Sequence, residues 1–400
     1  MNKREFVKTL GAGIVGAAAT GLPVGAAAAA APDGTSAAPP PPERVMNWVW
    51  ITPTPEPVPG GPPAPPPPTV DEWKRRFAML RANNIHAILP EIYDGRKAHY
   101  ASGFLPRAAD DWLGTILPLA RAEGLEVHAW MVSMPCNIPE MWAQHRDWFD
   151  VNGRGESSVD KPAYVDHYRF TCPNQPGSQD FIKKRVEEIC SIDGLDGIHF
   201  DYIRHPDVVI AQALQPKYGI VQDREYPEYD YCYCDVCRAA CRKQYGFDPM
   251  TLKDPAVSAE WRDFRYDSVT NLVNRHLIPV ARKKGKKTSA ATFPNWEAVR
   301  QRWHHWDVDY VLPMLYHNFY YGDANWVRDH TRAGIDRLRE QKKHTQLFSG
   351  LYVGDLYPAG LTRLIEKSYE GGARGVVIFS LRQMNDRLWA AFKDATSGVA

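Results

Sequence analysis

The chain has 400 residues, and its 48 Lys and Arg side chains nearly balance 47 Asp and Glu, which leaves a formal net charge of +1. This balance argues against a nucleic-acid-binding protein, which needs a clustered excess of positive charge. Hydrophobic residues make up 44% of the chain, too many for a disordered protein, and seven cysteines are too few for a disulfide scaffold. The length suits one large α/β barrel or about two to three average domains.

The N-terminal residues are typical of an export signal. Lys3 and Arg4 precede an apolar stretch, rich in Ala and Gly, that ends near Ala31. This order resembles a twin-arginine signal in which Lys3 replaces the first Arg. A membrane anchor is the alternative, but Gly and Ala dilute the apolar run, and no later stretch reaches the ~18 apolar residues of a membrane helix. We therefore expect an export signal at residues 1–31, a Pro/Ala-rich linker at 32–43, and a periplasmic or extracellular protein without a membrane span.

Eight strand-like apolar runs alternate with helical patterns over residues 44–396. The runs lie at 45–51, 85–92, 125–133, 196–203, 287–293, 308–316, 346–353 and 375–381. The helical patterns include Asp71–Ala82, Trp112–Glu123, Gln179–Ser191, Ala256–Lys284, Trp326–Gln341 and Leu361–Gly371. Eight such units predict an α/β fold, a (β/α)8 TIM barrel, in which the proline cluster Pro53–Pro68 is a stiff loop after the first strand. The alternative, an open doubly wound sheet, lacks a Gly-rich phosphate fingerprint after the first strand.

Two connections are longer than the others, and both follow a strand. The extra residues lie at about 135–168, after the third strand, and at about 206–255, after the fourth. Connections that follow barrel strands lie at the C-terminal mouth, where the active sites of such barrels form. We therefore predict long insertions after strands 3 and 4 that shape the site.

The fourth strand carries the most specific chemical signal. Strand alternation places His199 and Asp201 on one face and Phe200 on the other, with Asp201 at the C-terminal end. A carboxylate at this place can act as a nucleophile, a general base or a stabiliser of positive charge. Arg204 is expected to orient Asp201 through a charge-assisted hydrogen bond. The alternative is a purely structural Asp–Arg ion pair.

Hydrolysis of a glycosidic bond needs a second carboxyl group, one of the two being protonated. Glu91 ends the second strand, and Glu297 follows the fifth. The preferred catalytic pair is Asp201 with Glu91, and the second choice is Asp201 with Glu297. For each glutamate, a solvated or helix-capping carboxylate is the alternative.

Aromatic side chains gather at the same predicted strand ends. Because sugar rings present C–H faces that stack on aromatic rings, this rim suits a carbohydrate, although ordinary core packing is the alternative. The predicted substrate-binding residues are Trp48, Tyr93, His128, Trp130, His199, Tyr202, Arg204, Trp296, Tyr316, His317 and Asp355.

The insertion after the fourth strand contains closely spaced cysteines. Cys232, Cys234, Cys237 and Cys241 form the pattern C-x-C-x-x-C-x-x-x-C. Such thiolates can hold a structural zinc ion, whereas an oxidising compartment favours one or two disulfides, and free thiols are the third alternative. Cys172 and Cys190 are interpreted as buried or lone thiols. No cofactor is expected to be required for catalysis.

Four segments resemble the glycosyl hydrolase-like family 10, a family of exported bacterial barrel proteins. The resemblance covers about Arg44 to Trp389 and rests on Gly124–Trp130, Asp196–Arg204, Cys232–Cys237 and Trp306–Tyr316. It implies a (β/α)8 barrel and hydrolysis of glycosidic bonds, and some members act on peptidoglycan glycan strands. Asp201 matches the acidic position of the fourth strand, and the resemblance does not place the second carboxylate.

The sequence therefore predicts an exported glycoside hydrolase that acts on a polysaccharide or cell-wall glycan. One alternative is a barrel that binds carbohydrate without cleaving it. Another is a metal-dependent hydrolase, such as a deacetylase, that uses His128, His199 and Asp201 as ligands.

Overall fold

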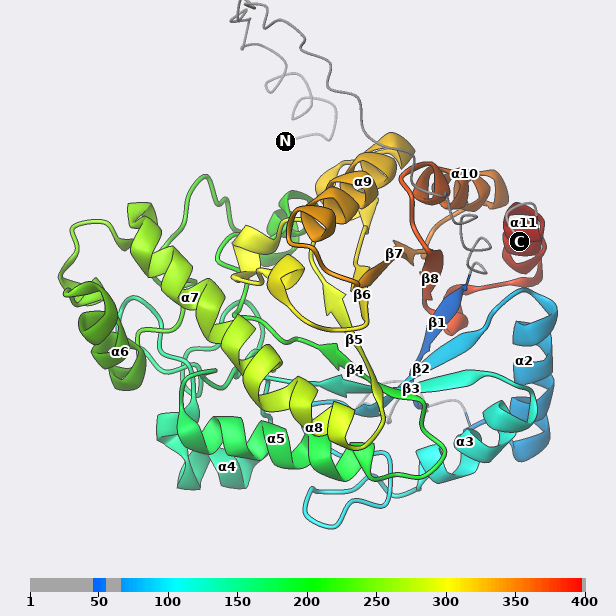
Figure 1. Ribbon diagram of the computed structural model, residues 1–400, viewed down its shortest axis with the longest axis horizontal. Helices are drawn as coiled ribbons and strands as arrows, with labels where there is room; N and C mark the ends of the chain where they lie inside the picture. The colour runs from blue at the N-terminus through cyan, green and yellow to red at the C-terminus, as the bar shows by residue number, and fades with distance from the viewer. Residues whose placement is uncertain (1–45, 55–65, 398–400) are drawn as a thin grey trace, which may run out of the picture. The chain divides into compact units, whose positions relative to one another are not determined.

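The computed structural model of the chain describes residues 46–54 and 66–397 (Figure 1). The expected export signal, the expected linker and residues 55–65 of the proline-rich loop lie outside these ranges. Within the described ranges, no helix combines the length and the apolar character needed to cross a membrane.

Eight parallel strands form a closed barrel in which each strand pairs with the next strand of the chain (Figure 1). The strands are β1 (Trp48–Ile51), β2 (Ala87–Tyr93), β3 (Glu126–Val132), β4 (Gly197–Asp201), β5 (Lys287–Thr292), β6 (Tyr310–Pro313), β7 (Gln346–Tyr352) and β8 (Gly375–Phe379). Pairing of Trp48 with Val377 and of Val49 with Ile378 joins the first strand to the last. The predicted TIM barrel is confirmed, and the open sheet is wrong.

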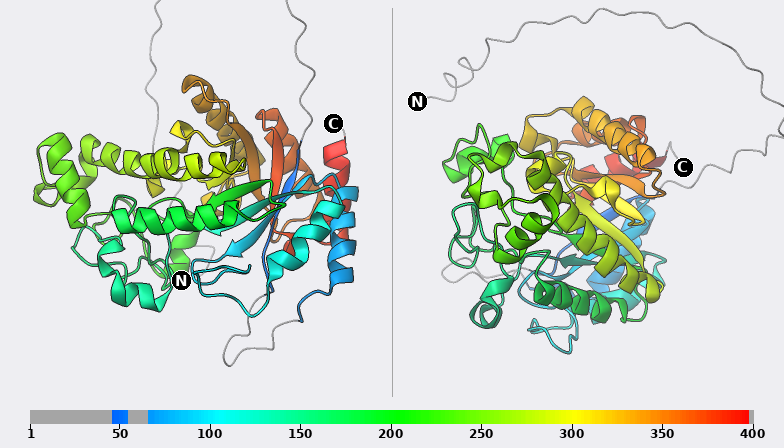
Figure 2. Two further views of the ribbon diagram at one scale, coloured as in Figure 1. Left: turned by 60° about the horizontal axis from the view of Figure 1, so that its bottom comes forward. Right: turned by 60° about the vertical axis from the view of Figure 1, so that its left-hand side comes forward.

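Helices follow the strands and surround the barrel (Figures 1 and 2). They are α2 (Val70–Ala82), α3 (Trp112–Ala122), α4 (Pro139–Gln144), α5 (Pro176–Cys190), α6 (Asp235–Tyr245), α7 (Ala259–Asn271), α8 (Ile278–Lys283), α9 (Ala324–Glu340), α10 (Pro358–Glu370) and α11 (Asp386–Ser397). The start of α2 shows how local sequence fixes a boundary. The Thr69 hydroxyl accepts from the Glu72 amide, and the Glu72 carboxylate accepts from the Thr69 amide, which forms a capping box.

The single helix expected at residues 256–284 is divided in the structure. A π-helical segment, Leu272–Leu277, separates α7 from α8. Pro279 lies in the first turn of α8 and has no amide hydrogen to donate to the preceding turn. A local change of hydrogen-bond spacing before the proline accommodates this loss without ending the helical path.

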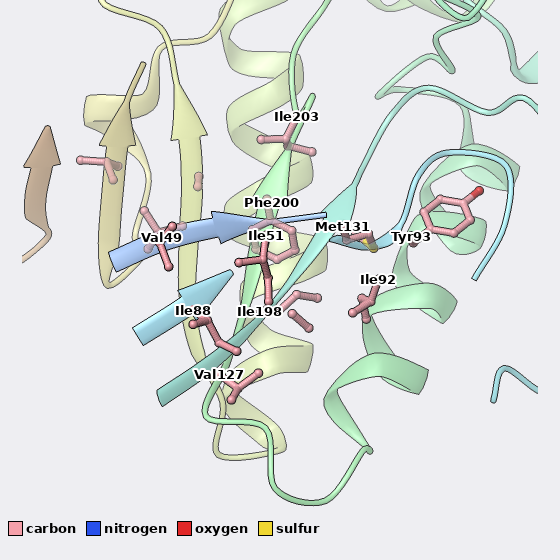
Figure 3. Packing of buried hydrophobic residues seen from close by; sticks show 14 of the residues in the cluster. Val49, Ile51, Ile88, Ile92, Tyr93, Val127, Met131, Ile198, Phe200 and Ile203 are labelled. Atoms are coloured by element: carbon pink, nitrogen blue, oxygen red, sulfur yellow. The ribbon is translucent and has the colours of Figure 1, made fainter. Parts of the chain in front are cut away.

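The main hydrophobic core lies between the strands and the surrounding helices (Figure 3). Val49, Ile88, Val127 and Ile198 take their places in this layer from four successive strands. The alternate positions of the strands fill the barrel interior, where Trp48, Trp50, Ala87, Leu89, Trp130, Ala291, Leu312, Phe348 and Val377 form a second cluster. This two-sided burial explains why the strands are nearly continuous apolar runs in the sequence.

Both predicted insertions are present and are joined to each other. The insertion after β3 contains α4, and the insertion after β4 contains the 3-10 helix Gln212–Tyr218 and α6. In Figure 1, α6 lies on the side of the barrel away from α2 and α11. Buried His205 lies 3.0 Å from Asp150 (Nδ1 to Oδ2), and the Tyr233 amide donates to the Val151 carbonyl at 2.7 Å. These contacts place the two insertions together at the mouth.

Candidate active site

A cavity of about 440 Å³ lies at the C-terminal ends of the barrel strands. Six strands supply residues to its wall: Trp50, Glu91, Trp130, Asp201, Ala291 and Phe379. Other lining residues come from the insertions and from the connections after the strands: Thr52, Tyr168, Tyr202, Arg204, Asp207, Ile210, Ala211, Leu214, Tyr218, Phe293, Met314, Tyr316, Phe319 and Tyr320. The cavity is within the size range of small-ligand sites, and its wall is mainly aromatic with a few acidic groups.

Asp201 is the last residue of β4, and both of its carboxylate oxygens are hydrogen-bonded. The indole Nε1 of Trp130 donates to Oδ2 at 3.1 Å, and the backbone amide of Tyr202 donates to Oδ1 at 2.7 Å. Tyr202 has φ of 50°, so the chain turns sharply after the strand and its amide reaches the carboxylate. Burial raises the pKa of Asp201 to about 6, although the Tyr202 amide, Arg204 and Trp130 favour the ionised form.

Glu91 lies near the end of β2 and lines the same cavity. Burial raises the pKa of Glu91 to about 8, and the negative charges of Asp94 and Asp201 add to this effect. Arg382 opposes the shift and does not cancel it. At neutral pH, therefore, Glu91 retains its proton while Asp201 is ionised. One protonated and one ionised carboxyl group in the same cavity is the arrangement that acid–base hydrolysis of a glycosidic bond requires.

Arg204 is paired with Asp207, which corrects the expectation that it orients Asp201. Its Nη1 donates to Asp207 Oδ2 at 3.0 Å, and both side chains are buried. The guanidinium lies 5.1 Å from the ring centroid of Tyr202 and 4.7 Å from that of Phe293. Arg204 therefore acts on Asp201 only through its charge. Asp207 is a third cavity carboxylate that was missed, because it lies in the irregular segment between β4 and the 3-10 helix Gln212–Tyr218, where no strand or helix period indicates the direction of a side chain.

His199 lies beneath the cavity and does not line it, contrary to its predicted role in binding substrate. Its Nε2 accepts from the indole Nε1 of Trp50 at 3.1 Å, so Nδ1 carries the proton and donates to Ser289 Oγ at 2.9 Å. Burial, together with His128, lowers the pKa of His199 well below its usual value and keeps the ring neutral. His199 thus holds Trp50, a cavity residue that was absent from the predicted set.

Of the other predicted binding residues, Trp130, Tyr202, Arg204 and Tyr316 line the cavity. Trp48 and His128 do not, because they fill a deeper layer of the barrel with ring centroids 4.6 Å apart. There, His128 Nε2 lies 3.2 Å from a carboxylate oxygen of Glu126.

Tyr93 faces away from the barrel interior and packs in the outer core (Figure 3). The Arg185 guanidinium lies 4.9 Å from the centroid of its ring. Strand alternation alone would put Tyr93 on the same face as Glu91, two residues earlier, but the register shifts between Glu91 and Tyr93 and this irregularity turns Tyr93 outward. Tyr93 is therefore a packing residue.

Four further candidates lie outside the cavity lining. Glu297 belongs to the 3-10 helix Trp296–Val299 and is exposed, while Trp296 packs against Tyr266 with ring centroids 5.0 Å apart. Asp355 is exposed in the turn after β7, and His317 is half-buried. The second choice of catalytic carboxylate, Glu297, is thus not brought into the cavity with Asp201, because the 3-10 helix turns it outward.

Several cavity residues were missed because only the folding of the insertions brings them to the strands. Tyr168 comes from the insertion after β3, and Leu214 and Tyr218 come from the insertion after β4. The 3-10 helix Gln212–Tyr218 contacts the 3-10 helix His317–Tyr320, which follows β6. The high tyrosine content of the insertions was the one signal available in the sequence.

The three ligands of the metal-hydrolase alternative are not gathered at one point. Within the described ranges, side chains that could together bind a metal ion meet in one group, which consists of Cys172, Cys232, Cys234 and Cys237. None of these cysteines lines the cavity. The predicted group needs a correction, because Cys172 takes the place that was assigned to Cys241. All seven cysteines are free, so the expected alternative of disulfides is not formed in the structure.

Comparisons with solved structures identify the fold. The chain is similar to the PgaB (BpsB) glycoside hydrolase domain from Bordetella bronchiseptica, with 14% identity, a TM-score of 0.63, and coverage of 88% of this chain and 98% of that one. It is also similar to the catalytic domain of a β-amylase from Paenibacillus polymyxa, with 11% identity, a TM-score of 0.56, and coverage of 89% and 98%. A third similar structure is a β-galactosidase from the psychrophilic Marinomonas ef1, with 10% identity, a TM-score of 0.59, and coverage of 88% of this chain and 59% of that one. At these low identities, the TM-scores establish a shared fold and nothing more.

The sequence comparison is more specific. No curated protein matches the chain by sequence. A family model described as Glycosyl hydrolase-like 10 matches residues 72–354, which is most of the chain and includes both Glu91 and Asp201. The chain therefore belongs to the Glycosyl hydrolase-like 10 family.

Proposed function

We propose that the protein is a glycoside hydrolase that cleaves O-glycosidic bonds in a polysaccharide or cell-wall glycan. The observation that carries this proposal is the pair of cavity carboxyl groups, Glu91 and Asp201, whose pKa values differ in the sense that acid–base catalysis needs. Family membership and the glycoside hydrolases among proteins of similar fold support the same reaction class.

In this proposal, Glu91 is the general acid. It donates its proton to the glycosidic oxygen as the bond to the anomeric carbon breaks, so the leaving group departs as a neutral alcohol. Its raised pKa keeps the proton available at neutral pH. After bond cleavage, Glu91 is an anion in a partly buried site, and it is reprotonated from solvent or from the attacking water.

Asp201 is the carboxylate that faces the developing positive charge at the anomeric carbon. It either attacks this carbon and forms a covalent intermediate or removes a proton from the attacking water. Hydrogen bonds from Trp130 and from the Tyr202 amide fix its orientation. Trp50, Trp130 and Tyr316 provide aromatic surface for the sugar rings. The anomeric configuration of the first product distinguishes the two routes.

We also propose that this hydrolysis takes place outside the cytoplasm. The basic start and the apolar Ala- and Gly-rich stretch of residues 1–31 support export, and an extracellular or periplasmic location would give access to cell-wall glycan. Cleavage of the chain near Ala31 in the producing cell, detected by N-terminal sequencing, is the expected result. An intact N-terminus in a cytoplasmic fraction would contradict the proposal.

The test of the reaction is a screen of the purified protein against neutral polysaccharides and peptidoglycan, with new reducing ends as the readout. Asp201→Asn and Glu91→Gln are expected to lower the rate on a responsive glycan by about 10²–10⁴-fold. Glu297→Gln is the matched control, since this exposed carboxylate does not line the cavity. Full activity of Asp201→Asn would refute its assignment. Glycan binding by the wild-type protein without bond cleavage would instead establish a carbohydrate-binding barrel.

A further inference from the structure

Four cysteine side chains meet where the two insertions join, away from the cavity. Cys172 lies between the insertion after β3 and the start of α5, Cys232 and Cys234 precede α6, and Cys237 lies in the first turn of α6. All four side chains are buried. Their sulfur atoms all lie within 4.8 Å of one another, although 60 positions of the chain separate Cys172 from Cys232.

The spacing of these sulfur atoms matches that of a tetrahedral zinc site. Four sulfurs at about 2.3 Å from a central ion are about 3.8 Å from one another. The Sγ of Cys172 lies 3.4 Å from that of Cys237 and 3.6 Å from that of Cys234. A disulfide would need a separation of about 2.05 Å, and all of these cysteines are free.

Backbone and side-chain N–H groups converge on the sulfurs, as expected for thiolates. Asn174 donates from its backbone amide to Cys172 at 3.4 Å and from its side-chain amide to Cys237 at 3.2 Å. The Val151 amide donates to Cys232 at 3.4 Å. Cys234 occupies the N-cap position of α6, so the positive end of the helix dipole also faces the cluster. A neutral thiol is a weak acceptor, whereas a metal-bound thiolate benefits from each of these donors.

We propose that Cys172, Cys232, Cys234 and Cys237 bind one Zn²⁺ ion with a structural role. Four protein ligands leave no open coordination position for a substrate or a water molecule. The ion would link the connection between β3 and α5, which contains Cys172, to the insertion after β4, which contains the other three cysteines. The insertion after β4 supplies Asp207, Leu214 and Tyr218 to the cavity wall, so the zinc site would fix one side of the cavity without taking part in hydrolysis.

Metal analysis of matched variants of the full chain tests the ligand set. Wild-type protein is expected to contain about one zinc ion per chain, as measured by inductively coupled plasma mass spectrometry. Cys172→Ser is expected to lower this content at least tenfold, whereas Cys241→Ser should retain it, since Cys241 is also buried on α6 but lies outside the group. Loss of zinc from Cys241→Ser with retention in Cys172→Ser would overturn the assignment.

A measurement on the wild-type protein covers the case in which Cys172→Ser fails to fold. X-ray absorption at the zinc edge is expected to show four sulfur neighbours at about 2.3 Å. A metal-free protein with intact thiols would overturn the proposal, as would disulfides that lower the mass of the unreduced chain. Neither result depends on glycan hydrolysis, so this proposal and the proposed enzyme activity can fail separately.

Discussion

At the scale of single residues, the two cavity carboxyl groups share one cavity and differ in their hydrogen bonds. Asp201 accepts from two N–H groups, which favour its ionised form and partly offset the effect of burial. Glu91 is surrounded by other negative charges, which add to the effect of burial on its pKa. The difference in protonation therefore follows from neighbouring groups, since both side chains carry the same functional group.

The pKa values predict a bell-shaped pH dependence of kcat/KM. Activity should fall below about pH 6, where Asp201 becomes protonated and loses its negative charge. It should also fall above about pH 8, where Glu91 loses the proton that the leaving group needs. Because the charges of Glu91 and Asp201 interact, the two apparent pKa values measured from this profile describe the pair of carboxyl groups and not either residue alone.

Substitution of Glu91 tests whether this residue causes the loss of activity above about pH 8. Residual activity of Glu91→Gln should lack the decline near pH 8, while Glu297→Gln should keep the wild-type profile. An unchanged alkaline limb in Glu91→Gln, measured on the same glycan, would show that another group supplies the proton.

At the scale of elements, the start of β4 requires a residue without a side chain. A Cβ atom at Gly197 would lie 2.4 Å from His128 Nδ1 on β3 and 2.7 Å from the Lys287 carbonyl oxygen on β5. The His128 ring occupies this space because it fills the deep layer of the barrel interior. The three strands can therefore pair in this register only if position 197 is glycine.

Gly197→Ala should reduce the free energy of unfolding by about 1–3 kcal/mol, the usual cost of overpacking a filled interior. Urea denaturation measures this loss. Gly103→Ala is the matched control, because the nearest atom to its added Cβ is a flexible Glu188 oxygen at 3.4 Å. Equal stability of the two variants would mean that β3 and β5 move apart without cost.

At the scale of the whole molecule, one buried ionic network connects the insertion after β4 to the rest of the barrel. Asp230 pairs with Arg265 of α7 and with Arg300, which follows β5, and the Arg300 contact measures 3.1 Å. The Tyr233 hydroxyl donates to the same carboxylate at 2.6 Å. Burial opposes ionisation of Asp230, but the two guanidinium groups outweigh this effect and lower its pKa.

Asp230→Ala should lower the free energy of unfolding by about 3–5 kcal/mol, because it leaves two buried guanidinium groups without their shared carboxylate. Asp235→Ala is the control, since the fully exposed Asp235 side chain lies 3.5 Å from Arg238 and such a solvent-screened pair should contribute little to stability. Chemical denaturation of both variants gives the comparison. Similar midpoints would show that Glu225, which also pairs with Arg300, compensates for the loss.

Most of the fold was predictable because its signals are local. Apolar runs of strand length, helical periodicity and glycines such as Gly124, with φ of 69°, mark the elements within a few residues. Strand alternation also placed Asp201 at the mouth. The division between α7 and α8 was missed, because one helix was expected over residues 256–284 although this range contains Pro279.

The sequence by itself determined the barrel, the two insertions and the position of Asp201, because each depends on the period and order of neighbouring residues. Only the tertiary structure decided which glutamate shares the cavity with Asp201, that Asp207 pairs with Arg204, and that Cys172 completes the cysteine cluster. These choices join segments far apart in the chain, and they depend on how the insertions fold across the mouth. Loop packing of this kind leaves no periodic trace in the sequence.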